Sequence, residues 1–112
     1  MIERTSAPLI LAVRLLSFEA NEQLRELSRL EHPVGIDELA LQFDDQAILV
    51  DQLVAAGQVS EEQQAIVRQI DELLRDMSGE VNAALWTPDS LRTSPLWANV
   101  RQLAKAFLDL TS

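Results

Sequence analysis

The sequence predicts an all-α protein, a compact bundle of four main helices plus short helical turns, in a single helical domain over residues 1–112. Three observations support this fold class. Apolar residues recur at helical spacing, and no segment alternates apolar and polar residues long enough for a strand. The three glycines and four prolines fall between these periodic segments. With 112 residues, 47% of them hydrophobic, the chain is large enough to bury a core without disulfides, and it has no cysteine.

The first helix is predicted to run from Ala7 to the step between His32 and Pro33. Ser6 is a suitable N-cap, and Pro8 falls in the first turn, where its missing N–H is not needed. A residue before proline is pushed out of the helical region, so the helix should end at His32. Its apolar stripe comprises Leu9, Val13, Leu16, Ala20, Leu24 and Leu27.

The second and third helices are predicted over residues 37–56 and from Ser60 to about Gly79. Gly57 is placed to stop the second helix. Ser60 and Gln63 have the spacing of a capping box, in which each side chain bonds a backbone N–H of the other residue. The expected core residues are Ile36, Leu39, Phe43, Ala47, Val50 and Val54 in the second helix, and Ile66, Ile70, Leu73, Leu74 and Met77 in the third.

Two N-cap and proline pairs predict the remaining helices. Thr87-Pro88 should open a single short turn over residues 89–92, and Ser94-Pro95 should open a final helix that extends to about Leu110. The expected core stripe of that helix comprises Leu96, Val100, Leu103, Phe107 and Leu110, and Trp97, Ala104 and Leu108 widen it.

The charge distribution is the strongest indication of function. The formal net charge is −9, and between Leu30 and Val67 there are eight acidic residues and no Lys or Arg. Such a negative field favours a basic protein partner and opposes binding to nucleic acid. The apolar run at residues 8–18 is too short to span a bilayer, so we expect no membrane association, and the lack of cysteine is compatible with the cytoplasm.

Acidic residues gather on one face of the second helix. On a wheel of 100° per residue the core stripe lies near about 240° and five acids lie near about 30°. Leu41 and Ile48 fall inside this acidic face, where a partner would have to cover them. A charged rim around an apolar centre is typical of an interface to a basic protein. A solvated face with two exposed aliphatic residues is the alternative interpretation. The candidate partner-binding residues are Asp37, Glu38, Leu41, Asp44, Asp45, Ile48 and Asp51.

Trp86 and Trp97 are secondary candidates for partner binding. They flank the turn at residues 87–95, where a pair of indoles usually forms a lid on the core. Tryptophan is also enriched among residues that dominate binding energy, so the segment at residues 85–88 is the second place where we expect a contact.

Catalytic and metal-binding constellations are not apparent. His32 is the only histidine, so Glu19, Glu22 and Glu26 cannot be completed into a di-metal site, which needs Glu-x-x-His motifs on facing helices. Asp44-Asp45 lacks the glycine and alternating oxygen ligands of a calcium loop. There is no phosphate-binding glycine loop and no nucleophile elbow. We therefore expect a protein that is not an enzyme and has no cofactor.

A helix-turn-helix is a further interpretation of the two central helices, joined at residues 56–59. Its second helix would need basic and amide side chains toward the DNA. Arg68 and Arg75 stand there among five acids, so a transcription regulator is the less favoured hypothesis.

In size, charge and helical architecture the whole chain resembles the small, acidic, all-helical immunity proteins that neutralise nuclease toxins in bacterial competition. These include inhibitors of DNase bacteriocins and of contact-dependent growth-inhibition toxins. The tyrosine pair of the bacteriocin inhibitors has no counterpart here, because the chain has no tyrosine. The resemblance implies a cytoplasmic inhibitor that binds a nuclease toxin domain and blocks its active site or substrate surface. The alternative is an acidic helical adaptor or secretion chaperone, whose apolar helix faces could pair two copies as a dimer; the sequence does not fix the oligomeric state.

Overall fold

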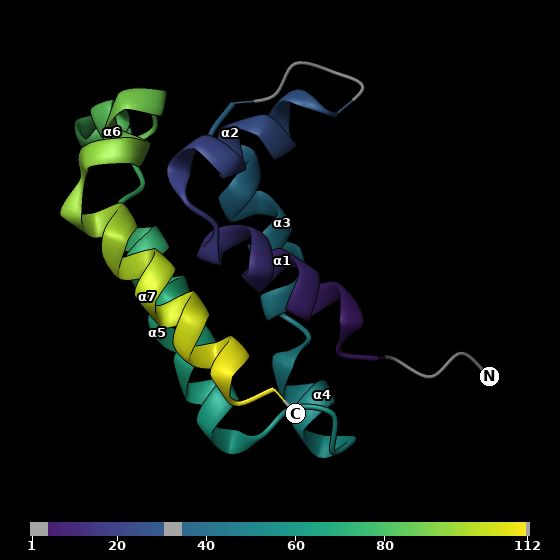
Figure 1. The fold of residues 1–112 in the computed structure, drawn as a ribbon. Helices are drawn as coiled ribbons and strands as arrows, with labels where there is room; N and C mark the ends of the chain where they lie inside the picture. The colour runs from purple at the N-terminus through teal and green to yellow at the C-terminus, as the bar shows by residue number, and fades with distance from the viewer. Residues whose placement is uncertain (1–4, 31–34, 112) are drawn as a thin grey trace.

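The computed structural model describes residues 5–30 and 35–111, and these residues form helices and no strand (Figure 1). The all-α class is confirmed, whereas the count of four main helices is not, because two of the predicted helices are interrupted. None of the described helices has the length and apolarity that crossing a bilayer requires. The elements are α1 (Ala7–Ser17), α2 (Ala20–Ser28), α3 (Asp37–Ala47), α4 (Val50–Ala55), α5 (Glu61–Asp76), the 3-10 helix η1 (Glu80–Leu85), α6 (Pro88–Thr93) and α7 (Pro95–Asp109).

Helix α7 packs against both α1 and α5, and α3 packs against the same two helices. Figure 1 shows α7 and α5 running alongside each other, with α1 and α3 beside them. The apolar faces of these four helices therefore meet in one core. The largest fully buried apolar side chains there are Trp97, Phe43, Phe107, Leu9, Leu16, Leu39, Ile70, Met77 and Leu91.

The prediction of one continuous first helix is wrong, because the helix breaks at Phe18 and Glu19. Both residues are extended, with ψ of 154°. The fully buried side chain of Gln23 explains the break: its Nε2 donates to the carbonyl oxygens of Leu15 and Leu16, at 3.1 Å each. Carbonyls at the end of α1 thus obtain a partner without a further helical turn. The predicted stop at His32 lies outside the described residues, and α2 already ends at Ser28.

The second predicted helix is also interrupted, at Ile48 and Leu49. The Leu49 N–H donates to the Gln46 carbonyl, three residues back, so the turn is tighter than an α-helical turn. This changes the phase of the helix, and Leu53 is buried where Val54 was expected.

The predicted stop at Gly57 is confirmed. Its φ is +75°, in the left-handed region that favours glycine. The Gln58 N–H donates to Leu53 at 2.9 Å and the Gly57 N–H to Val54 at 3.0 Å. These two bonds form a Schellman motif, which satisfies the last carbonyls of α4.

The capping box at the start of α5 is confirmed. The Ser60 hydroxyl accepts from the Gln63 N–H, and the Gln63 Oε1 accepts from the Ser60 N–H, at 3.0 Å each. Gln63 is buried, and its Nε2 also donates to the Phe107 carbonyl at 3.3 Å and to the Thr111 hydroxyl at 3.0 Å. The same side chain therefore begins α5 and fixes it to the end of α7.

Replacing Ser60 with alanine should lower the free energy of unfolding by about 1 kcal/mol, because it removes the acceptor for the Gln63 N–H. Ser60→Gly is the matched comparison, and it should cost only a few tenths of a kcal/mol. Urea denaturation followed by circular dichroism measures both. Equal stability of the alanine variant and the unmodified protein would contradict the assigned cap.

Both predicted proline caps are confirmed. The Thr87 hydroxyl accepts from the Ser90 N–H and the Ser94 hydroxyl accepts from the Leu96 N–H, each at 3.2 Å. The core face of α7 differs from the expected stripe, because Leu96 and Leu110 are 37% and 42% exposed. The buried residues are Trp97, Val100, Ala104 and Phe107.

Candidate protein-binding surface

The seven candidate residues lie along the outer side of α3 and the start of α4, and we call this set the acidic surface. Asp37, Glu38, Leu41, Asp44, Asp45, Ile48 and Asp51 are its members. All are exposed except Glu38, which is half-buried. Leu41 is 51% exposed and Ile48 is 74% exposed, so the helix does present two aliphatic side chains to solvent among its acids.

Shallow grooves lie on both sides of α3. The groove against α1 and α2 has a volume of about 310 Å³, and its lining is mainly apolar, with Leu11, Phe18 and Leu30 among the lining residues. On the other side, two adjoining grooves of about 250 and 240 Å³ run between α3 and α5. Ile48 lines the first of these two and Leu41 lines the second, and we call the two together the α3–α5 groove. Helix α3 therefore forms a ridge whose aliphatic side chains border this groove.

Two arginines of α5 lie beside the acidic surface, and sequence reasoning did not place them there. Arg68 pairs with Asp51 at 3.1 Å, and Arg75 pairs with Asp71 at 2.8 Å. Both arginines line the α3–α5 groove. The segment between Leu30 and Val67 therefore has no Lys or Arg in the sequence, but in the folded protein two arginines of α5 lie along one edge of the acidic surface. The spacing of Arg68, Asp71 and Arg75 indicates a shared helix face, but it does not say which helix that face meets.

Three acids of α3 have no arginine partner in the described part of the chain. Within residues 5–30 and 35–111, Asp37, Asp44 and Asp45 make no ion pair. The Asp51–Arg68 pair itself joins side chains that are 71% and 65% exposed. A pair this exposed contributes about 0–1 kcal/mol, so it leaves most of the negative field available to an approaching protein.

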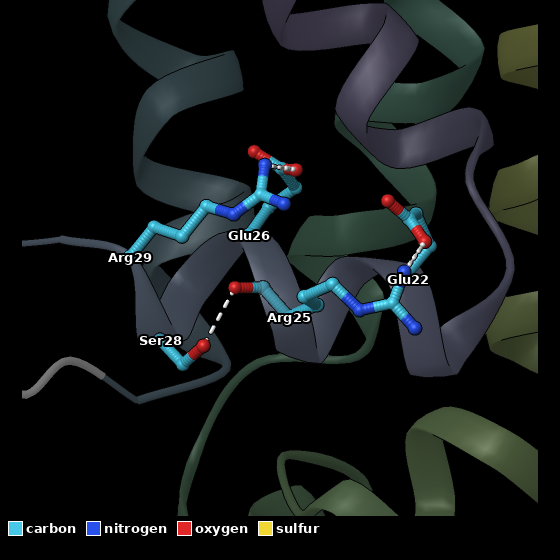
Figure 2. A network of polar contacts seen from close by, with 5 residues as sticks. All are labelled: Glu22, Arg25, Glu26, Ser28 and Arg29. Atoms are coloured by element: carbon cyan, nitrogen blue, oxygen red, sulfur yellow. Dashed lines mark hydrogen bonds and ion pairs between the residues drawn. The ribbon is translucent and has the colours of Figure 1, made fainter.

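Helix α2 provides a contrast within the same molecule (Figure 2). Arg25 pairs with Glu22 and Arg29 pairs with Glu26, at 2.7 Å each and at i,i+3 spacing. The Ser28 hydroxyl donates to the Arg25 carbonyl at 2.7 Å. This is the mixed-sign pattern of an ordinary solvated helix face. The described residues hold no group of three possible metal ligands, and these glutamates pair with arginines instead.

The two tryptophans form part of the core lid. Their rings meet edge-on, with centroids 5.2 Å apart and planes at 84°. Trp97 is fully buried and its Nε1 donates to the Leu85 carbonyl, while Trp86 is half-buried and donates to Met77, at 2.7 Å each. Trp97 therefore offers no surface to a partner, which corrects its selection as a secondary candidate. Trp86 stays a prediction.

Arg101 is the centre of a group of hydrogen bonds that sequence reasoning missed. Its Nε donates to the Phe18 carbonyl at 3.2 Å, and its Nη2 donates to the Leu91 carbonyl and lies 3.5 Å from Gln23 Oε1. Burial lowers the pKa of the Arg101 guanidinium, and the negative charge of Glu19 partly opposes this. The group nonetheless stays cationic at any ordinary pH. Its position at the end of α1 suits a positive charge, because helix carbonyls converge there.

The chain matches no family model, no curated protein and no solved structure. The arrangement of charge and apolar surface on α3 and α4 is therefore the basis for any functional proposal.

Proposed function

We propose that this protein is an immunity or antitoxin protein that binds a basic toxin domain, a nuclease, through the acidic surface and so inhibits it. One observation carries the proposal: Leu41 and Ile48 are exposed on a helix whose acids Asp37, Asp44 and Asp45 have no ion-pair partner among the described residues. The aliphatic side chains supply area that a partner can desolvate. The acids supply attraction and orientation.

Charge explains why a nuclease is the favoured partner. An enzyme that acts on DNA or RNA must hold phosphates, so its working surface is basic. A protein of net charge −9 meets such a surface with long-range attraction, which raises the association rate. The inhibitor competes with nucleic acid for the same cations. We place the protein in the cytoplasm, where a nuclease toxin would meet its substrate.

The proposal is tested by charge reversal on α3. We expect Asp44→Lys plus Asp45→Lys to weaken binding to the toxin-like domain encoded beside this chain by roughly 100-fold or more, because two attractive charges become repulsive. Isothermal titration calorimetry measures the affinity, and a nuclease assay measures inhibition. Affinity of the unmodified protein should also fall as salt is raised.

The matched control is Glu72→Lys plus Asp76→Lys. These two acids are exposed on α5 and line neither groove, and the double reversal changes the net charge by the same amount. It should reduce the affinity far less than the α3 reversal. Equal losses for both variants would show a non-specific charge effect and overturn the proposed surface. Absence of binding by the unmodified protein would overturn the proposed function.

The second candidate function is an acidic adaptor or secretion chaperone that forms a dimer. The apolar groove beside α1 and α2 favours it, because Leu11 is 62% exposed and Leu30 is 41% exposed there. Mutual repulsion between two chains of charge −9 works against it. Sedimentation of the isolated protein distinguishes the two functions, since a stable dimer favours the adaptor and a monomer favours the inhibitor.

A further inference from the structure

We propose that the α3–α5 groove binds one arginine side chain of the basic partner, and that Arg75 is an internal competitor for that place. The inference deepens the proposed function and rests on it for the nature of the partner. It concerns Asp44, Asp71 and Arg75, which line both of the adjoining grooves between α3 and α5. Only Asp44 among these belongs to the acidic surface.

The charges that line the groove are one cation short of balance. Three carboxylates face two guanidinium groups, and each arginine is engaged with one aspartate. Arg68 holds Asp51 and Arg75 holds Asp71. Asp44 is left without an ion pair among the described residues. A single added positive charge therefore neutralises the groove.

The floor of the groove suits the aliphatic part of a long basic side chain. Ala40 and Leu41 line it toward one end, and Ala47 and Ile48 line it toward the other, above core residues that are themselves buried. The volumes of about 250 and 240 Å³ are several times the roughly 30 Å³ that a water molecule occupies in the liquid. Arginine can lay its methylene groups on such a floor and still present its charge at the rim. Its planar fork also matches carboxylates better than the point charge of lysine does.

Arg75 can leave its position readily. Its side chain is 73% exposed, and its pair with Asp71 is an i,i+4 contact within one helix. Pairs of this kind contribute about 0.3–0.5 kcal/mol, so a partner arginine displaces it with little loss. Arg75 therefore lowers the affinity of the groove for cations in general. A partner that also covers Leu41 and Ile48 binds strongly enough to displace Arg75 from the groove.

The probes that test this are three short peptides: Ac-Gly-Arg-Gly-NH2, the neutral isostere with citrulline in place of arginine, and the analogue with lysine in place of arginine. Titration into ¹⁵N-labelled protein, followed by amide chemical shifts, should give saturable shifts at Asp44, Ile48 and Asp71 with the arginine peptide, at affinities on the order of millimolar. The citrulline peptide should give none. Absence of saturable groove shifts, equal shifts with citrulline, or equal affinity for the lysine analogue would overturn the assignment.

Two variants with the same charge change isolate the role of Arg75. Arg75→Gln should tighten binding of the arginine peptide roughly twofold, since it frees Asp71. Arg25→Gln removes an equivalent exposed arginine from its pair with Glu22 on α2 (Figure 2) and should leave the affinity nearly unchanged. Equal effects of the two variants, or weaker binding by Arg75→Gln, would overturn the internal competition. These peptides are not the toxin, so their failure removes the groove assignment alone, and failure to find a toxin partner removes the proposed function alone.

Discussion

Replacing Trp97 with alanine is expected to lower the free energy of unfolding by about 3–5 kcal/mol, the largest effect of any single substitution considered for this chain. The indole is fully buried, so its loss leaves a cavity in the core beside Leu85 and Trp86. It also removes the donor for the Leu85 carbonyl and the edge-on contact with Trp86. Domains of this size are stable by about 5–15 kcal/mol in total, so the variant should be partly unfolded on warming.

Circular dichroism during urea denaturation measures this effect without depending on tryptophan fluorescence. Trp86→Ala is the comparison, and it should cost clearly less because that ring is only half-buried. The cost of Trp97→Phe should be smaller than that of Trp97→Ala but not zero, since phenylalanine keeps apolar volume and loses the N–H donor. A cost below 1 kcal/mol for Trp97→Ala would show that the ring is not part of the core.

The second large effect is expected at Arg101. Arg101→Met keeps much of the aliphatic packing but leaves the Phe18 and Leu91 carbonyls without their donor. We expect a loss of about 1–2 kcal/mol, because the two partly buried carbonyls are left without a protein donor. Arg101→Lys should restore only part of it, because one ammonium group cannot reach acceptors arranged around a planar fork. Urea denaturation is again the measurement.

Lys105→Met controls for the loss of a cation from α7. Lys105 is exposed one turn after Arg101 and makes no ion pair among the described residues, so its replacement should be nearly neutral.

A double-mutant cycle that combines Arg101→Met with Gln23→Leu tests whether Arg101 and Gln23 act together at the end of α1. Strictly additive losses would contradict that coupling.

The parts of the fold that depend on neighbours in the chain could be predicted from sequence. Ser60, Thr87 and Ser94 cap helices through residues two or three positions away, and Gly57 ends α4 through its own backbone conformation. These interactions are complete within one turn, so local spacing could identify them, although Ser6, selected by the same reasoning, makes no side-chain cap for α1.

The break in the first predicted helix could not be predicted, because a residue far along the chain contributes to it. Nothing near Phe18 in the sequence forbids a continuous helix. The backbone carbonyls at the break accept hydrogen bonds from the buried Gln23 amide and from Arg101, which lies 83 residues from its acceptor on Phe18. Such pairing overrides local propensity only after the helices have packed.

The candidate site divides in the same way. The exposure of Leu41 and Ile48 follows from helical periodicity, and it is confirmed at 51% and 74%. The arginines of α5 follow only from the packing of α3 against α5, which periodicity does not specify. The partner of this surface stays a prediction.

The position of α7 between α1 and α5 has a consequence for how the chain acquires its structure. The last described helix covers the first one, so α1 leaves the ribosome long before its main neighbour has been made. Contacts at such sequence separation slow folding, and apolar surface left open in the meantime invites aggregation. We expect removal of residues 95–111 to yield an aggregation-prone chain, even though α1 to α5 would all remain in it.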